Sequence, residues 1–156
     1  MIGLEERVAA MMRLQGEPAR VVAAAVRDPE RELRQILLEL GAPDHLSGHP
    51  YTVRAVLWVL EEPKLMQSVS TGLYKRLAEH FHTTPDRIER SIRHLAEVTW
   101  LRGDQAAIRV YFGSTVSPAR GKPTNRELIA RLANVVRQRM WDRSGNVHRD
   151  ESALKQ

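Results

Sequence analysis

The sequence predicts an all-α protein, and three observations carry this prediction. Apolar residues make up 42% of the 156 residues, which is enough for the core of one domain with a small accessory segment. Apolar side chains recur at three- and four-residue spacing in successive segments, as they do on one face of a helix. Asp, Thr, Pro and Gly stand at the borders of these segments, where helices begin and end.

The chain is predicted to begin with one or two short helices. Residues 4–14 place Leu4, Val8 and Met11 on one helical face. Residues 18–26 form a second short segment that begins with a proline, a residue that suits the first turn of a helix.

The next two helices are bounded by proline and glycine. Asp28 and Pro29 suit the N-cap and first position of a helix that ends at Gly41. Residues 47–50, SGHP, are expected to form a loop. Residues 51–62 contain VRAVLWVL, which has strand propensity, but the helical neighbours favour a helix that ends before the next proline.

The stretch from Thr71 to Trp100 is predicted to form two helices joined by a tight, polar turn. The first helix covers residues 71–81 and directs three apolar residues toward the core: Leu73, Leu77 and Phe81. The second helix covers residues 85–100, and Thr84 can serve as its N-cap.

The second helix of this pair has two distinct faces when its residues are placed at about 100° per step. Its core side carries Ile88, Ile92, Leu95 and Thr99. Its opposite side carries Arg87, Arg90, Arg93, His94 and Glu97, with Glu89 at the edge. One packed side and one cationic side are what a helix needs to lie between a domain core and a DNA groove.

The residue types on the cationic side suit base recognition. Arginine can form a two-pronged hydrogen bond with guanine, which discriminates between bases by about 1–3 kcal/mol. Glu89 or Glu97 could accept from cytosine, and His94 could donate to a phosphate or a base. The first helix would place three residues near the DNA backbone: Tyr74, Lys75 and Arg76. A charged outer face is also common to surface helices, and that interpretation stays open.

The C-terminal part is predicted to hold a short helix at residues 104–109, a loop at 111–123 and a final helix at 124–141. Thr124 and Glu127 make a capping-box pattern at the start of the final helix, and Trp141 could anchor its end. The chain beyond is polar and is expected to fray. The predicted divisions are a helical extension at 1–28, a DNA-binding domain at 29–141 and a polar tail at 142–156.

Charge is distributed unevenly along the chain. Residues 1–62 hold seven Arg and ten acidic residues, whereas residues 63–156 hold 17 basic and nine acidic residues. A basic C-terminal part indicates a polyanionic partner. Lys122 and Asn125 are candidates for phosphate contact, although capping by Thr124 explains the same block equally well. A GC-rich genome also raises arginine content, so abundance alone does not establish nucleic-acid binding.

Several function classes are disfavoured by what the sequence lacks. There is no cysteine, which excludes disulfides, thiolate zinc sites and thiol catalysis and fits a reducing cytoplasm. The N-terminus does not have the pattern of a signal peptide, and no apolar stretch is long enough to span a membrane. His45 and His49 are four residues apart, but no carboxylate cluster completes a metal site. We expect no catalytic residue, metal or cofactor, and therefore no enzyme.

Three blocks of the sequence together resemble one known family: HFHTTPDRIERSIRHLAEVTWLRGD, YFGSTVS and GKPTNRELIARLA. They are similar to the C-terminal effector domain of the sporulation master response regulator, stage-zero sporulation protein A, over roughly Leu33 to Met140. The resemblance implies a six-helix domain with a helix-turn-helix that binds operators and regulates transcription. It places the family's base and backbone contacts at Arg87, Glu89, Arg90, Arg93 and His94.

The resemblance also implies partners and a location. Double-stranded DNA is the first partner, and a second copy of the chain on DNA is a further candidate. The family contacts an RNA polymerase sigma factor through the segment after its recognition helix, here part of Gly103 to Val116. This chain differs most in the first half of that segment. No membrane partner is implied, and the bacterial cytoplasm, at the nucleoid, is the expected location.

The N-terminus departs from the family pattern, which places a phosphoacceptor receiver domain before the effector domain. Residues 1–32 are too few for a receiver domain and have a helical pattern. The chain is therefore interpreted as either a receiver-less paralogue or a trimmed form. Its first helices either cap the domain, which we favour, or supply a substitute dimer contact.

Two functions from different classes follow from these observations. The first is a sequence-specific DNA-binding transcription regulator, linked to sporulation or related developmental control. The second is a receiver-less interaction module that modulates the full-length regulator or a sigma factor. The acidic N-terminal half and the amphipathic residues 4–14 favour this second function.

Overall fold

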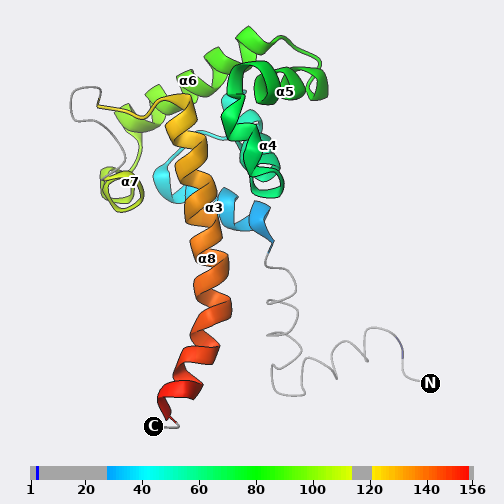
Figure 1. Cartoon of the computed structure of the whole chain (residues 1–156). Coiled ribbons are helices and arrows are strands. Elements are labelled where there is room, and N and C mark those ends of the chain that lie inside the picture. The colour runs from blue at the N-terminus through cyan, green and yellow to red at the C-terminus, as the bar shows by residue number, and fades with distance from the viewer. Residues whose placement is uncertain (1–2, 4–27, 114–120, 155–156) are drawn as a thin grey trace.

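The computed structural model describes residue 3, residues 28–113 and residues 121–154, with side chains up to Asp142. Over these ranges the chain forms six α-helices and no strand, so the predicted all-α class is confirmed (Figure 1). The helices are α3 (Pro29–Leu40), α4 (Gly48–Glu61), α5 (Tyr74–His80), α6 (Pro85–Arg102), α7 (Gln105–Phe112) and α8 (Asn125–Leu154). A 3-10 turn (η1, Pro63–Gln67) and a π turn (η2, Val69–Leu73) connect α4 to α5. The helices predicted within residues 4–26 lie outside the described ranges.

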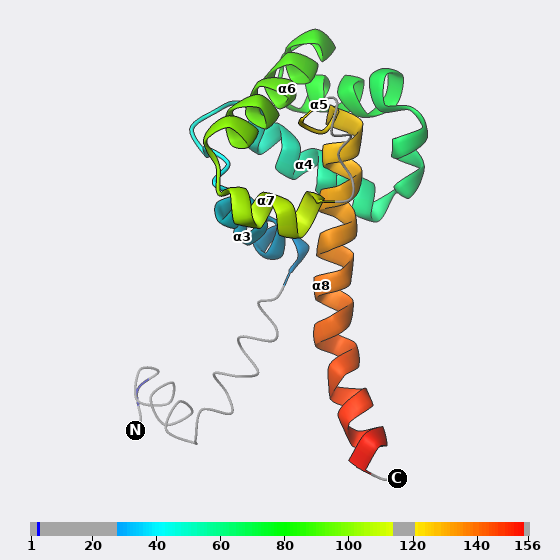
Figure 2. The same ribbon diagram turned by 90° about the vertical axis from the view of Figure 1, so that its left-hand side faces the viewer.

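The core forms where α4 packs against both α6 and α8 and where α3 lies against α8. The apolar stripe of α3 is buried in it as predicted, through Leu33, Ile36, Leu37 and Leu40. The predicted core side of α6 is buried as well, through Ile88, Ile92, Leu95 and Thr99. Figures 1 and 2 show α6 at one end of the domain, while α8 runs along the body and projects from the opposite end.

Helix ends follow the capping residues that the sequence shows. The Asp28 carboxylate accepts a hydrogen bond of 2.7 Å from the Arg31 amide at the start of α3. Gly41 ends this helix with a φ of 76°, a left-handed conformation that glycine adopts without strain. Thr124 and Glu127 form the predicted capping box, with an amide–side-chain hydrogen bond of 3.2 Å in each direction.

The predicted loop at residues 47–50 is wrong, because α4 begins at Gly48. Glycine and proline indicate a loop in the sequence, yet the first turn of a helix tolerates both. A Cβ atom at Gly48 would lie 2.2 Å from the Ser91 carbonyl oxygen of α6. Glycine therefore lets the start of α4 approach the backbone of α6, which a loop prediction from local signals does not anticipate.

Other boundaries also differ from prediction. The loop expected from Tyr111 starts later, because α7 continues to Phe112. The Phe112 ring is buried and packs edge-on against the Trp100 ring, with 4.9 Å between the ring centroids. Residues 114–120 of that loop lie outside the described ranges. The tail expected to fray from Asp142 is instead part of α8, which continues to Leu154. Trp141 does not anchor a helix end, since it is 74% exposed.

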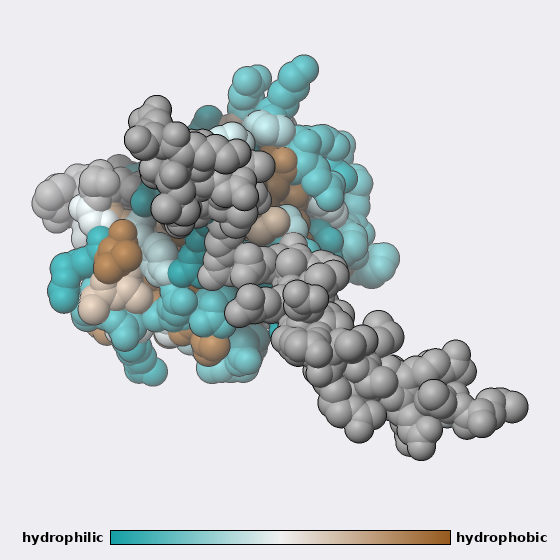
Figure 3. Space-filling view, turned by 90° about the horizontal axis from the view of Figure 1, so that it is seen from below, coloured by the Kyte–Doolittle hydropathy of each residue, from teal (hydrophilic) through white to brown (hydrophobic). Residues whose placement is uncertain are grey.

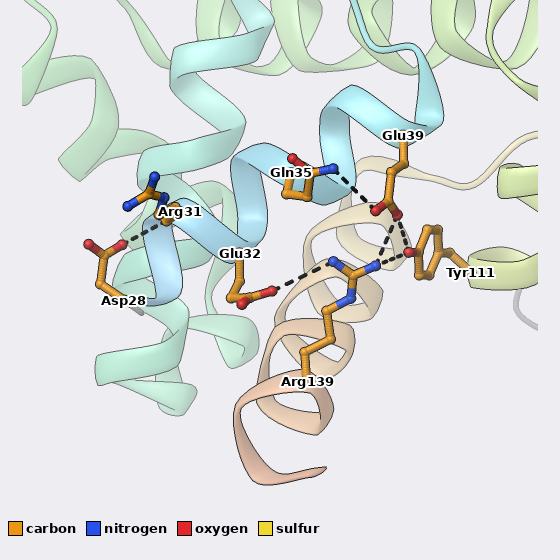
Figure 4. Close-up of polar contacts among 7 residues, drawn as sticks. All are labelled: Asp28, Arg31, Glu32, Gln35, Glu39, Tyr111 and Arg139. Atoms are coloured by element: carbon orange, nitrogen blue, oxygen red, sulfur yellow. Dashed lines mark hydrogen bonds and ion pairs between the residues drawn. The ribbon is translucent and has the colours of Figure 1, made fainter. Parts of the chain in front are cut away.

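A cluster of polar contacts joins α8 to α3 and α7, and Arg139 lies at its centre (Figure 4). Its guanidinium group lies 3.6 Å from the Glu32 carboxylate and donates to Glu39 at 2.9 Å. It also donates to the Tyr111 hydroxyl, which in turn donates to Glu39. Gln35 donates to the other oxygen of Glu39 at 3.4 Å. The cluster fixes the direction in which α8 leaves the domain.

Candidate nucleic-acid interface

Helices α5 and α6 form a helix-turn-helix unit. The turn between them includes His82, whose φ of 54° lies in the left-handed region. The Thr83 amide donates back to the Ala78 carbonyl at 2.9 Å, as in a Schellman-type helix end. The Thr84 hydroxyl accepts from the Arg87 amide at 3.3 Å and starts α6. The tight turn that the sequence predicts is therefore confirmed.

The outer face of α6 presents three of the predicted site residues to solvent: Arg87, Arg90 and His94. Within the described ranges, neither Arg87 nor Arg90 lies in an ion pair. Arg90 makes only a long contact of 3.4 Å to the Asp86 carbonyl of its own helix. His94 lies 4.0 Å from Glu97, and both side chains are at least half exposed. All three side chains are therefore accessible on the outer face of α6.

Two other predicted residues, Glu89 and Arg93, are paired with each other on the side of α6 that faces α8. The Arg93 Nε atom donates to the Glu89 carboxylate at 3.0 Å, and its Nη2 atom donates to the same oxygen. This hydrogen bond to Glu89 raises the pKa of Arg93. The pair is one helical turn apart and partly exposed, so solvent screens it. Arg93 is therefore less free than Arg87 and Arg90.

Two hollows flank α6. The first has a volume of about 310 Å³ and lies between α6 and the start of α4. Its lining includes Ser47, Gly48, Arg87, Arg90 and His94. The second has a volume of about 390 Å³ and lies between α6, η2 and the start of α8. Its lining includes Ser70, Arg93, Thr124 and Arg126. Both hollows therefore combine arginine with serine or threonine, groups that can donate to phosphate oxygens.

The start of α8 is attached directly to α6. The buried Asn125 amide donates to the Glu89 carbonyl at 2.9 Å. Tyr74 lies in the same hollow and is 6% exposed, and burial is the main reason that its pKa is raised. In the structure, Asn125 and Tyr74 are buried and contribute to the packing of the domain. This differs from the prediction, in which Asn125 contacts a phosphate and Tyr74 lies near the DNA backbone.

The remaining basic candidates lie in different environments. Lys75 is exposed on α5, and Lys122 is partly buried just before α8. Arg76 lies over the Trp58 ring at 4.3 Å and pairs with Glu62 at 3.4 Å, so it stabilises the α4–α5 junction. Arg126 was not among the predicted site residues, and it is exposed at the second hollow. Its position in the first turn after the Thr124 cap is the signal that could have identified it.

Other site classes have little support in the part of the chain that the structure describes. No group of three or more His, Asp or Glu side chains lies close enough there to hold a metal ion. None of the described helices combines the length and apolar character that crossing a bilayer requires. His49, one of the histidines considered as a ligand, is buried in α4, and burial is the main reason that its pKa is lowered.

An all-α domain with a helix-turn-helix and an exposed cationic second helix defines the class of DNA-binding regulatory domains. The chain matches the family described as Sporulation initiation factor Spo0A C terminal over residues 33–136, about two thirds of its length. The chain belongs to this family, and the resemblance seen in its sequence is confirmed. The family is a DNA-binding domain of a sporulation response regulator and not a catalytic family.

Proposed function

We propose that this protein is a sequence-specific DNA-binding transcription regulator whose helix α6 lies in the major groove. The observation that carries the proposal is the exposed row on α6, formed by Arg87, Arg90 and His94. Neither arginine of this row has a carboxylate partner within the described ranges, so binding to DNA would not have to break an internal ion pair. Family membership supports DNA as the partner.

We also propose a division of roles along α6. Arg90 lies in the middle of the exposed row and is our candidate for bidentate pairing with a guanine. Arg87 and His94 line the first hollow together with Ser47, and we assign them to base or phosphate contacts there. Glu89 and Arg93 would act as a pair at the edge of the groove, where the carboxylate holds the guanidinium in one orientation.

Contacts to the DNA backbone are proposed on both sides of α6. Lys75 on α5, and Lys122 and Arg126 at the start of α8, would contact phosphates. Because the Asn125–Glu89 hydrogen bond attaches α8 to α6, these phosphate contacts would hold α6 at a defined depth in the groove. We further propose that the protein acts in the cytoplasm at the nucleoid and that two copies bind adjacent DNA elements.

The test is selection of genomic fragments by the purified chain, followed by gel-shift measurements on the recovered sequence and on a scrambled one. We expect a recurring sequence motif, and we expect affinity to fall steeply with salt as condensed counterions are released. Recovery of no motif, with equal affinity for both fragments at every salt concentration, would contradict sequence-specific recognition.

A second candidate, contact with an RNA polymerase sigma factor, is favoured by one observation. Leu101 at the end of α6 and Val110 on α7 are large apolar residues that are 76% and 74% exposed. They lie in or next to the segment through which the family resemblance implies sigma contact. Pull-down of sigma factor without DNA should succeed with the unmodified chain and fail with Val110→Asp. Equal recovery by both would exclude α7 from the contact.

A further inference from the structure

An apolar groove lies beside the part of α8 that leaves the domain, away from the DNA-binding face. It has a volume of about 690 Å³. Pro29 at the start of α3, Leu60 of α4, and Val136, Met140 and Trp141 of α8 form its walls. Viewed from the end at which α8 projects, the domain shows hydrophobic residues at its surface among hydrophilic ones (Figure 3).

The groove is largely an addition to the family domain. The family match covers residues 33–136, whereas Pro29, Met140 and Trp141 lie outside it. Its walls are also held in place, because Arg139 fastens this part of α8 to Glu32 and Glu39 of α3. The groove is therefore a formed surface, and its walls do not depend on a ligand to hold them together.

Trp141 makes the groove a candidate for docking. It is 74% exposed, and an aromatic side chain at the edge of an apolar surface loses unfavourable contact with water when a second apolar surface covers it. Exposed apolar patches with polar rims are typical of docking surfaces, and the exposed Arg137 and Gln138 form such a rim here.

The chain itself supplies a matching segment at this place. Residues 4–26 precede Asp28, the N-cap of α3, and the adjacent Pro29 is a wall of the groove. The segment is rich in apolar residues, namely Leu4, Val8, Met11, Met12, Leu14, Val21, Val22 and Val26. Its attachment gives it an effective concentration near the groove of roughly millimolar, far above that of a free partner at micromolar concentration.

We propose that residues 4–26 bind in this groove of the same chain and cover Trp141. The segment then acts as an intramolecular cap of the α3–α8 end of the domain. Figures 1 and 2 place this end opposite α6, so capping leaves the cationic face of α6 exposed. Covering the groove also withholds this surface from a second copy of the chain.

The absence of cysteine allows a direct test by engineered disulfides in the full chain. Gln138→Cys places one thiol at the exposed rim of the groove. Single cysteines at positions 8, 11, 22 and 26 supply the second thiol, one pair per variant. The matched control pairs each of these with Glu79→Cys, an exposed position on α5. Unchanged circular dichroism and thermal unfolding of the reduced variants verify the fold.

Mild oxidation should produce an intramolecular disulfide in at least one groove pair, seen as a faster-migrating monomer on a non-reducing gel. Its yield should not depend on protein concentration and should exceed that of the matching Glu79→Cys control. Crosslinked dimers as the main product would assign the groove to a second copy and overturn the proposal. Yields equal to those of the controls for all four pairs would also overturn it.

The indole N–H resonance of Trp141, assigned with Trp141→Phe, gives an independent readout that needs no cysteine. Val22→Asp should shift this resonance toward the position of a solvent-exposed indole, because the charged side chain weakens docking. The control Val110→Asp on α7 should leave it unchanged. A Trp141 resonance that both variants leave unchanged would contradict occupancy of the groove by this segment.

Discussion

The exposed row on α6 and the cluster around Arg139 use the same side chain in opposite ways. The Arg139 side chain is 22% exposed, and it contacts two carboxylates, a tyrosine hydroxyl and, at 5.3 Å, the Tyr111 ring. Arg87 and Arg90 are exposed and have no carboxylate partner among the described side chains. Some arginines of this chain therefore stabilise the domain, whereas others remain available to a polyanion.

This difference has an energetic consequence. Neighbouring cations on α6 repel each other in the free protein, and a phosphate backbone would relieve that repulsion. The charge of Arg139 is already neutralised by carboxylates inside the domain, so Arg139 would add nothing to the affinity for DNA. Substitution of arginines in the two regions should therefore separate effects on DNA recognition from effects on stability.

The largest expected effect is on recognition, from Arg90→Ala. Loss of a bidentate contact to guanine should remove operator preference, at about 1–3 kcal/mol for that base pair. Thermal unfolding should stay unchanged, because Arg90 is exposed. Gel shifts with operator and scrambled DNA measure the preference, and Arg102→Ala, an exposed arginine at the end of the same helix, is the control. Full discrimination by the Arg90 variant would show that another element reads the sequence.

The next effect is on stability, from Arg139→Ala. The substitution removes the central donor of a partly buried network that joins α3, α7 and α8. Urea unfolding should show a decrease of about 1–3 kcal/mol in the free energy of unfolding. At temperatures where the variant is folded, its operator preference should match that of the unmodified chain. A variant that kept its stability but lost discrimination would remove the distinction between the two regions.

A smaller effect is expected from Arg126→Ala at the start of α8. If this residue contacts a phosphate, affinity should fall by a similar factor for operator and scrambled DNA. The slope of the logarithm of affinity against the logarithm of salt concentration should become shallower by about one. Arg137→Ala, an exposed arginine farther along the same helix, is the matched control. An unchanged slope would place Arg126 away from the DNA backbone.

The smallest effect concerns pH and Glu39. Burial is the largest influence and raises the pKa of Glu39, but hydrogen bonds from Tyr111 and Gln35 and the charge of Arg139 together outweigh it. The net shift is below the ordinary value of 4.5, so folding favours the carboxylate. Its contribution is present above that value and is lost as pH falls through the lowered pKa.

Thermal unfolding of the unmodified chain and of Glu39→Gln, compared between about pH 7 and pH 3, measures this contribution. The difference in stability between the two proteins should shrink toward the acid end. A difference that is constant over the whole range would mean that the ionisation of Glu39 does not stabilise the fold.

The local features of the sequence predicted much of this domain. Asp28, Thr84 and the Thr124–Glu127 box begin helices as expected, because a capping side chain contacts backbone amides only a few residues away. Helical periodicity predicted both faces of α6. It also placed Glu89 and Arg93 one turn apart, and that spacing could have predicted their pairing.

Contacts between distant segments decided the rest. The helical start at Gly48, the burial of Asn125 and Tyr74, and the commitment of Arg139 to α3 each depend on a residue more than 30 positions away or on packing by other helices. In a single sequence an arginine has the same appearance whether a carboxylate neutralises it or water surrounds it. The residues alone determined the helices and the cationic face, because those follow from short-range spacing. Only the tertiary structure decided which charged and polar groups remain free, because that depends on the partners that folding brings near.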